Sequence, residues 1–282
     1  MSRQVYFPDH PSDMDRARIV IVPAPYDGTS TWIKGADKGP RAIMEASKHL
    51  EDYDIETGTE VWQQGIATDI PVTECDTPEA MVQAVQNRVG HHLQQGKYPV
   101  VLGGEHSVSI GSVRAHADHY DNLTVLQLDA HTDLRDSYCG SPYNHACVMA
   151  RIQEDCPIVQ VGIRSMDQAE RVRLDPGRVF YAKDCVTGRA WIDSVIGKLS
   201  DRIYITLDLD VFDPAIVPST GTPEPGGLLW YDVLALLKAV CANCQVVGFD
   251  VVELCPNPLV KTPDFLAAKL VYQLLSLEFS KR

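Results

Sequence analysis

Six side chains of the types that bind divalent metal ions lie at the ends of three apolar runs. They are His106, Asp129, His131, Asp133, Asp208 and Asp210. In the motif 129–133 these residues stand two apart, and alternate residues of a strand share one face. Aspartate is depleted in strands, and clustered carboxylates resist burial unless a cation neutralises them. Each residue alone is typical of a solvated loop or a core histidine, but together they indicate a metal centre.

The composition of this set bears on both the kind and the number of ions. Oxygen-rich sites favour Mg, Ca or Mn, whereas thiolate-rich sites favour Zn or iron–sulfur clusters. Six ligands are more than one catalytic ion with an open position needs, so two ions that share carboxylates fit better. Such pairs, about 3.5–4 Å apart, activate a water molecule near neutral pH. The residues therefore predict a hydrolase.

The elements that must position these ligands follow from the apolar pattern. Eight runs rich in β-branched residues predict strands at 18–26, 65–72, 98–106, 123–131, 157–164, 178–184, 202–212 and 244–254. Helix-like spacing falls between most of them, at 78–95, 107–118, 144–154, 189–199, 230–242 and 263–279. This alternation predicts a parallel sheet covered on both faces, with ligands bound beyond the carboxyl ends of the strands. An open sheet and a (β/α)8 barrel both fit.

Length and charge limit the classes of function. The 282 residues contain no Pro/Gly/Ser-rich linker and no internal repeat, so we expect a single domain, 1–282. The 25 Lys and Arg against 38 Asp and Glu argue against nucleic acid or an anionic membrane as a partner. The same balance suits a small cationic substrate.

Targeting signals and disulfides are not expected. No apolar run approaches the roughly 20 residues of a membrane span, and the polar start 1–4 lacks the pattern of a signal peptide. We therefore expect a cytoplasmic protein whose eight cysteines are free thiols. Cys241-Ala-Asn-Cys244 has no second CxxC motif, so we interpret it as structural.

Taken together, the motifs resemble those of the ureohydrolases, the arginase/agmatinase family. The matching segments are 103–107 (GGEHS), 129–133 (DAHTD), 208–214 (DLDVFDP) and 248–253 (GFDVVE), with 25–30, 39–43 and 221–227 outside the metal motifs. The resemblance implies a three-layer α/β/α fold with an eight-stranded, mostly parallel open sheet. It also implies two Mn²⁺ ions per chain, hydrolysis of a guanidino group to urea and an amine, and a homotrimer or homohexamer.

The same resemblance implies a role for each site residue. It assigns one Mn²⁺ to His106, Asp129, Asp133 and Asp208, and the other to Asp129, His131, Asp208 and Asp210. Asp133 would hold the metal-bridging hydroxide and pass its proton to the leaving amine. Glu253 would pair with the guanidinium nitrogens, and His145 would shuttle protons to bulk solvent.

Within the family, the segments 133–140 and 145–152 resemble prokaryotic agmatinases, which convert agmatine to putrescine and urea. Asn144 and Ala150 depart from their pattern. Arg135 has two interpretations: it binds a substrate carboxylate, as in formiminoglutamate hydrolases, or Asp136 or another acidic group neutralises it, which we favour. The alternatives are a guanidinobutyrase, an arginase or a formiminoglutamase. Beyond these stand a catalytically silent metal-binding member and a zinc deacetylase of the same architecture.

Overall fold

All eight predicted strands are present, and they join one sheet in the computed structural model, which describes residues 5–74 and 76–280. The strands are β1 (Ile19–Ala24), β2 (Ile66–Thr68), β3 (Tyr98–Gly103), β4 (Leu123–Leu128), β5 (Ile158–Ile163), β6 (Val179–Tyr181), β7 (Arg202–Asp208) and β8 (Gln245–Val252). Their order is β2-β1-β3-β8-β7-β4-β5-β6, and every neighbouring pair is parallel. The sheet is therefore open and not a barrel, as the family resemblance implied.

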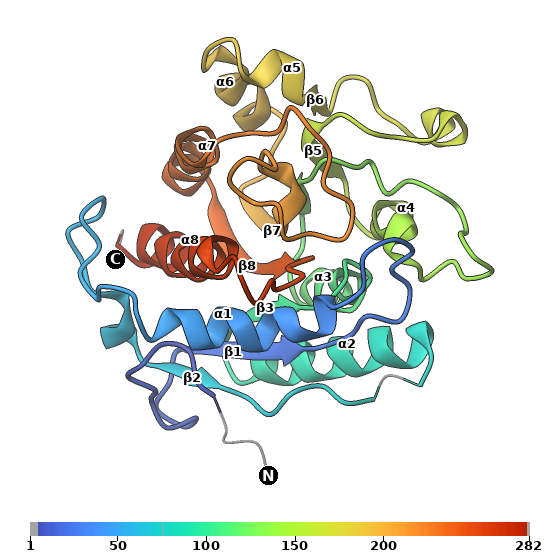
Figure 1. Cartoon of the computed structure of the whole chain (residues 1–282). Coiled ribbons are helices and arrows are strands. Elements are labelled where there is room, and N and C mark those ends of the chain that lie inside the picture. Colours follow the sequence, from blue (N-terminus) through green and yellow to red (C-terminus); the bar gives the residue numbers. More distant parts are fainter. Residues whose placement is uncertain (1–4, 75, 281–282) are drawn as a thin grey trace.

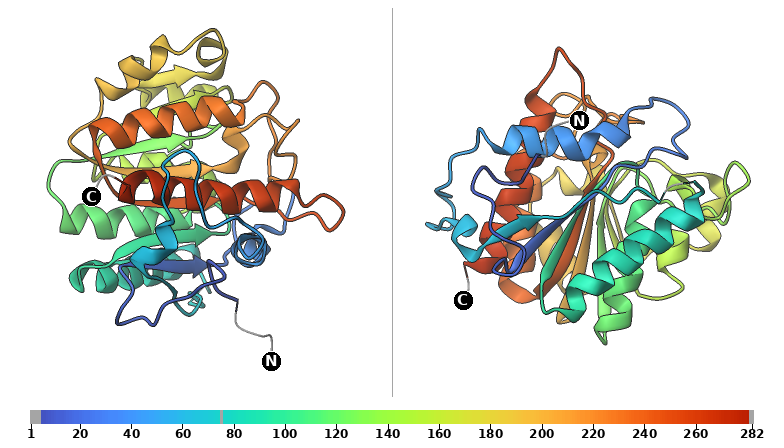
Figure 2. Two further views of the ribbon diagram at one scale, coloured as in Figure 1. Left: turned by 90° about the vertical axis from the view of Figure 1, so that its left-hand side faces the viewer. Right: turned by 90° about the horizontal axis from the view of Figure 1, so that it is seen from below.

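Helices cover both faces of this sheet (Figures 1 and 2). They are α1 (Gly39–Ser47), α2 (Pro78–Gln94), α3 (Val108–His119), α4 (Val148–Ile152), α5 (Ala182–Cys185), α6 (Ala190–Ile196), α7 (Trp230–Asn243) and α8 (Thr262–Phe279). One face carries α1, α8, α7 and α6 in contact with one another, and the other carries α2, α3 and α4. Helix α1 was not predicted from the apolar pattern, although Pro40 near its start is a known helix-initiation signal.

The strands bury side chains on both faces, which explains why their sequences are continuously apolar. In β1, Ile19 and Ile21 pack into the core under α1 and α8, whereas Val20 and Val22 pack into the core under α2 and α3. Burying each such side chain is worth about 1.5–3 kcal/mol. Two apolar layers thus hold the central strands, and with them the ends that carry the candidate ligands.

The structure also bears on the cysteines and on membrane-spanning helices. None of the seven described cysteines forms a disulfide, and Cys75 lies outside the described residues, as does the start 1–4. In the described ranges, every helix is too short or too polar to cross a bilayer.

Candidate metal centre

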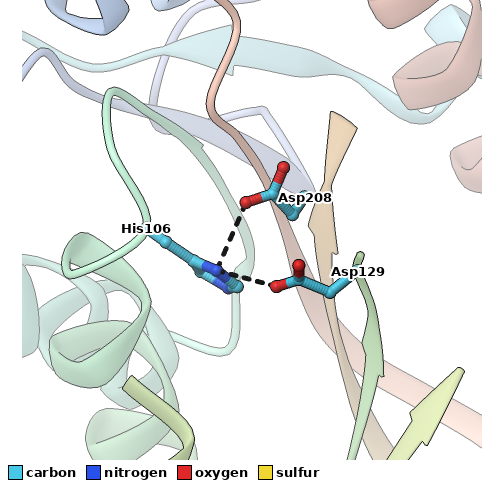
Figure 3. A group of neighbouring side chains, drawn as sticks. All are labelled: His106, Asp129 and Asp208. Atoms are coloured by element: carbon cyan, nitrogen blue, oxygen red, sulfur yellow. Dashed lines mark ion pairs between the residues drawn. The ribbon is translucent and has the colours of Figure 1, made fainter. Parts of the chain in front are cut away.

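The six candidate ligands meet at the carboxyl edge of the sheet. His106 follows β3 by three residues, Asp129 follows β4 directly, and Asp208 is the last residue of β7. Figure 3 shows these three side chains pointing toward one another from three separate segments of the chain. Because β4 and β7 are neighbours and only β8 separates β7 from β3, the segments that carry His106 and Asp208 are brought together although they are far apart in sequence.

The local geometry of 129–133 differs from the predicted strand face. Strand β4 ends at Leu128, so the motif lies in the loop after it. Asp133 has φ 52°, in the left-handed region that non-glycine residues rarely adopt. The turn of the backbone, not strand alternation, brings Asp133 back toward His106.

A first cluster of donors surrounds one ring nitrogen. Nδ1 of His106 lies 2.9 Å from Asp133 Oδ2, 3.2 Å from Asp129 Oδ2 and 3.5 Å from Asp208 Oδ2. Despite these distances, Nδ1 has no partner of hydrogen-bond geometry among the described residues. A buried nitrogen ringed by carboxylate oxygens is the arrangement expected of ligands to a shared cation.

A second cluster shares Asp129 with the first. Nδ1 of His131 lies 2.9 Å from Asp210 Oδ2 and 3.6 Å from Asp129 Oδ1. Backbone amides fix these carboxylates: His131 donates to Asp129 Oδ1 at 2.6 Å, and Ala130 donates to Asp210 Oδ1 at 2.9 Å. The donor atoms of His131, Asp129 and Asp210 lie close enough to hold one ion.

The electrostatics of the two clusters fit bound cations. Burial, and then repulsion from Asp210 and Asp129, raises the pKa of Asp208 well above its ordinary value. Burial and the charge of Asp129 raise the pKa of Asp133 to about 7. Such carboxylates resist ionisation until positive charge is supplied. Oxygen and imidazole donors in these numbers fit two hard or borderline divalent ions.

Glu253 lies beside the same clusters and also has an unusual backbone. It follows β8 with φ 68°, and its Oε1 accepts the backbone N–H of His106 at 2.7 Å. Glu253 and five of the six candidate ligands line one cavity of about 250 Å³, together with His145 and Arg135. Asp129 is not among the lining residues, but it lies directly behind them, in contact with His106 and His131.

His145 is anchored by residues that the sequence analysis did not single out. Its backbone N–H donates to Thr29 Oγ1 at 2.9 Å, and its Nδ1 lies 3.2 Å from the same oxygen. Thr29 Oγ1 in turn donates to Glu105 Oε1 at 2.8 Å. Burial lowers the pKa of His145 to about 4, so the ring is neutral at pH 7. Thr29 and Glu105 both lie in segments that resemble the ureohydrolases, 25–30 and 103–107. That resemblance could have identified them as site residues.

Two glutamines that were not predicted from the sequence hold Asp129 in place. Gln127 Nε2 donates to Asp129 Oδ2 at 2.7 Å, and Gln160 Nε2 donates to Gln127 Oε1 at 2.6 Å. Both glutamines are buried in strands. A polar residue inside an otherwise apolar run was the signal that could have identified them.

Arg135 is paired with acidic residues at the mouth of the pocket. Its guanidinium lies 3.3 Å from Asp167 Oδ2 and 3.4 Å from Glu170 Oε1, and it stacks over the ring of Tyr138. Asp136 pairs instead with arginines on other elements. The acidic groups beside Arg135 are therefore Asp167 and Glu170, and its charge is offset within the protein.

Known proteins are similar to this chain in sequence and in fold. A sequence model described as the arginase family matches residues 17–276. The chain is 38% identical over 270 residues to an N(1)-aminopropylagmatine ureohydrolase from Synechocystis, covering 92% of this chain and 88% of that protein. It is 32% identical over 272 residues to an agmatinase from Pyrococcus horikoshii, covering 94% and 93%. The solved agmatine ureohydrolase of Thermoplasma volcanium matches with a TM-score of 0.88 at 32% identity, covering 99% of this chain and 96% of that one.

Proposed function

This chain belongs to the arginase family of ureohydrolases, and within that family we propose that it hydrolyses agmatine to putrescine and urea. The observation that carries the proposal is the pocket itself. Two donor clusters share Asp129, and their other members line the same cavity as Glu253 and His145. This combination supplies a site for two cations, a carboxylate for the substrate and a group that exchanges protons.

We further propose that the bound ions are two Mn²⁺. The first would be held by His106, Asp129, Asp133 and Asp208, and the second by Asp129, His131, Asp208 and Asp210. When bound, such ions act as Lewis acids that lower the pKa of water and so supply a nucleophile at neutral pH. The predominance of oxygen donors is what favours Mn²⁺ over Zn²⁺.

In this proposal three residues of the chain handle the substrate and the protons. Glu253 Oε1 is occupied by the His106 amide, so Oε2 is left to accept charge-assisted hydrogen bonds from the guanidinium and to fix its carbon. Asp133 takes the proton of the attacking water and passes it to the leaving amine. His145, half-buried at the wall of the pocket, shuttles further protons between the site and bulk solvent.

The pairing of Arg135 supports a substrate with a cationic tail. A substrate carboxylate would need a free guanidinium at the mouth of the pocket, and Arg135 is already engaged by Asp167 and Glu170. One arginine against two carboxylates leaves this part of the rim acidic, which favours an ammonium group over a carboxylate. Agmatine carries only an ammonium beyond its guanidino group, whereas arginine, 4-guanidinobutyrate and formiminoglutamate carry a carboxylate.

A second candidate substrate is N(1)-aminopropylagmatine. It is favoured by the Synechocystis relative, whose name specifies this activity. The candidate shares the guanidino end and the cationic character of agmatine, so it requires the same two clusters and the same Glu253. The two substrates differ only in what lies beyond the first amine.

Urea release with five substrates tests the proposal. The Mn²⁺-loaded enzyme is assayed with agmatine, N(1)-aminopropylagmatine, arginine, 4-guanidinobutyrate and formiminoglutamate under identical conditions. We expect the highest kcat/KM for agmatine. A higher value for N(1)-aminopropylagmatine would establish the second candidate, and a higher value for a carboxylate-bearing substrate would contradict both.

The assembly is a separate proposal that the family resemblance supports. We propose a homotrimer or a homohexamer. Multi-angle light scattering on the purified protein measures the mass directly, and a strict monomer would contradict this proposal.

A further inference from the structure

Behind His106, a chain of buried hydroxyl and carboxyl groups connects its ring to the middle of the sheet. Nε2 of His106 lies 2.9 Å from Thr206 Oγ1. Thr206 Oγ1 donates to Asp250 Oδ1 at 2.7 Å, and the hydroxyl of Tyr204 donates to Asp250 Oδ2 at 2.7 Å. Thr206, Asp250 and Tyr204 have no solvent exposure. None of these three groups has a part in the proposed reaction.

The protons in this chain can be placed from the number that each group carries. A threonine hydroxyl has one proton, and its shortest contact is with the Asp250 carboxylate, so Thr206 donates there. Thr206 Oγ1 must then accept in its contact with His106, which means that Nε2 of His106 carries a hydrogen. The tautomer with hydrogen on Nε2 leaves the lone pair on Nδ1, the atom that faces Asp129, Asp133 and Asp208.

The sheet register holds this chain in place. Thr206 and Asp250 are directly paired in the parallel β7–β8 ladder. Tyr204 lies two residues before Thr206 and so projects from the same face of β7. The hydroxyl of Ser112 on α3 lies 2.7 Å from the Tyr204 hydroxyl. A buried carboxylate with both oxygens satisfied by hydroxyls of the neighbouring strand cannot turn away without breaking these bonds.

We propose that Thr206, Asp250 and Tyr204 are positioning residues for the metal ion that His106 binds. They fix the tautomer and the rotation of the imidazole so that Nδ1 presents its lone pair to the first cluster. Outer partners of this kind orient metal-binding histidines, and their loss costs about 10–100-fold in metal affinity. The second cluster uses His131, which has no contact with Thr206 or Asp250 among those described, so its ion should be unaffected.

The test measures metal binding in the absence of substrate. Mn²⁺ binding to the metal-stripped full-length protein is followed by equilibrium dialysis, which resolves two equivalents per chain. Thr206→Val removes the hydroxyl at constant shape, and we expect it to weaken one equivalent about 10–100-fold while the other is unchanged. Asp250→Asn should also weaken that one equivalent, and Tyr204→Phe should weaken it less because the Thr206–Asp250 bond remains.

Two matched variants separate positioning from a general loss of structure. Thr206→Ser keeps the hydroxyl and should bind both equivalents as the unaltered protein does. Ser112→Ala removes a contact one step further from His106 and should also leave both affinities unchanged. Unchanged binding in Thr206→Val, or an equal weakening of both equivalents, would overturn the inference. The inference rests on the proposed role of His106 as a metal ligand. The substrate proposal is tested separately, by urea release, so failure of one can be distinguished from failure of the other.

Discussion

Thr29 and His145 are 116 residues apart in sequence, yet Thr29 Oγ1 lies 3.2 Å from His145 Nδ1 and accepts its backbone N–H. The Thr29 hydroxyl gives its one proton to Glu105, whose side chain is fully buried. The imidazole Nδ1 must therefore donate to Thr29, and the free lone pair is on Nε2. This contact determines which nitrogen of His145 is available to accept a proton.

Removing the Thr29 hydroxyl should lower turnover without abolishing it. Thr29→Val leaves two hydrogen-bonding atoms of His145 without their acceptor, so the ring is held less firmly. We expect kcat for agmatine to fall by about tenfold. The loss should not exceed that of His145→Ala, because a general acid–base group contributes about 10²–10⁴-fold in all. Thr29→Ser is the control, and it should retain most of the activity. Equal activity in Thr29→Val and the unaltered enzyme would show that this contact does not position His145.

Asp133 and His145 should differ in how much their loss costs. Asp133→Asn removes both a proposed metal ligand and the proton acceptor, so we expect no measurable turnover. His145→Ala removes a shuttle that solvent or buffer partly replaces, so kcat should fall by about 10²-fold. Added imidazole should restore part of the activity of His145→Ala. Equal and complete loss in both variants, with metal retained, would mean that the shuttle is misassigned.

Metal removal should abolish activity, and reloading should restore it with two ions per chain. The two clusters hold more carboxylate than a single ion can neutralise. Elemental analysis after Mn²⁺ reloading is expected to give a ratio near two, and Mn²⁺ should give higher activity than Zn²⁺ or Mg²⁺. A ratio near one, or full activity after exhaustive chelation, contradicts the dinuclear site.

The buried His116 should make stability depend on pH below about 6.5. Burial lowers its pKa to about 4, so the unfolded chain binds a proton more readily than the folded one between about pH 4 and 6.5. As the pH is lowered from about 6.5 to about 4, His116 alone should reduce the free energy of unfolding by about 3 kcal/mol. Urea denaturation at several pH values is the measurement. His116→Gln, which does not titrate, should show a loss that is smaller by that amount.

Arg135 should contribute little to catalysis with agmatine. Its charge is offset by Asp167 and Glu170, and a partly exposed ion pair contributes about 0–1 kcal/mol. We expect Arg135→Ala to change kcat/KM for agmatine by less than about fivefold. Activity toward 4-guanidinobutyrate or formiminoglutamate that exceeds the agmatine activity and disappears in Arg135→Ala would show that Arg135 binds a carboxylate.

The sequence predicted the strands well because buried parallel strands have a simple apolar pattern. It also located the ligands at strand ends. The left-handed backbone of Asp133 and Glu253 was not predictable, because non-glycine residues rarely adopt it and nothing in the local sequence distinguishes these two from the other acidic residues. The Thr29–Glu105 bond and the pairing of Thr206 with Asp250 depend on which strands are neighbours, and that order is set by the packing of the whole sheet.

The strand order also has a consequence for how the protein is made. Strand β8 lies between β3 and β7, although it is the last strand in the sequence. His106 follows β3 on one side of it, and Asp208 ends β7 on the other. On the ribosome, these two halves of the sheet can form early but have no common edge until β8 emerges and joins them. A nascent chain in which β8 has not yet been made therefore holds the candidate ligands without the strand that aligns them.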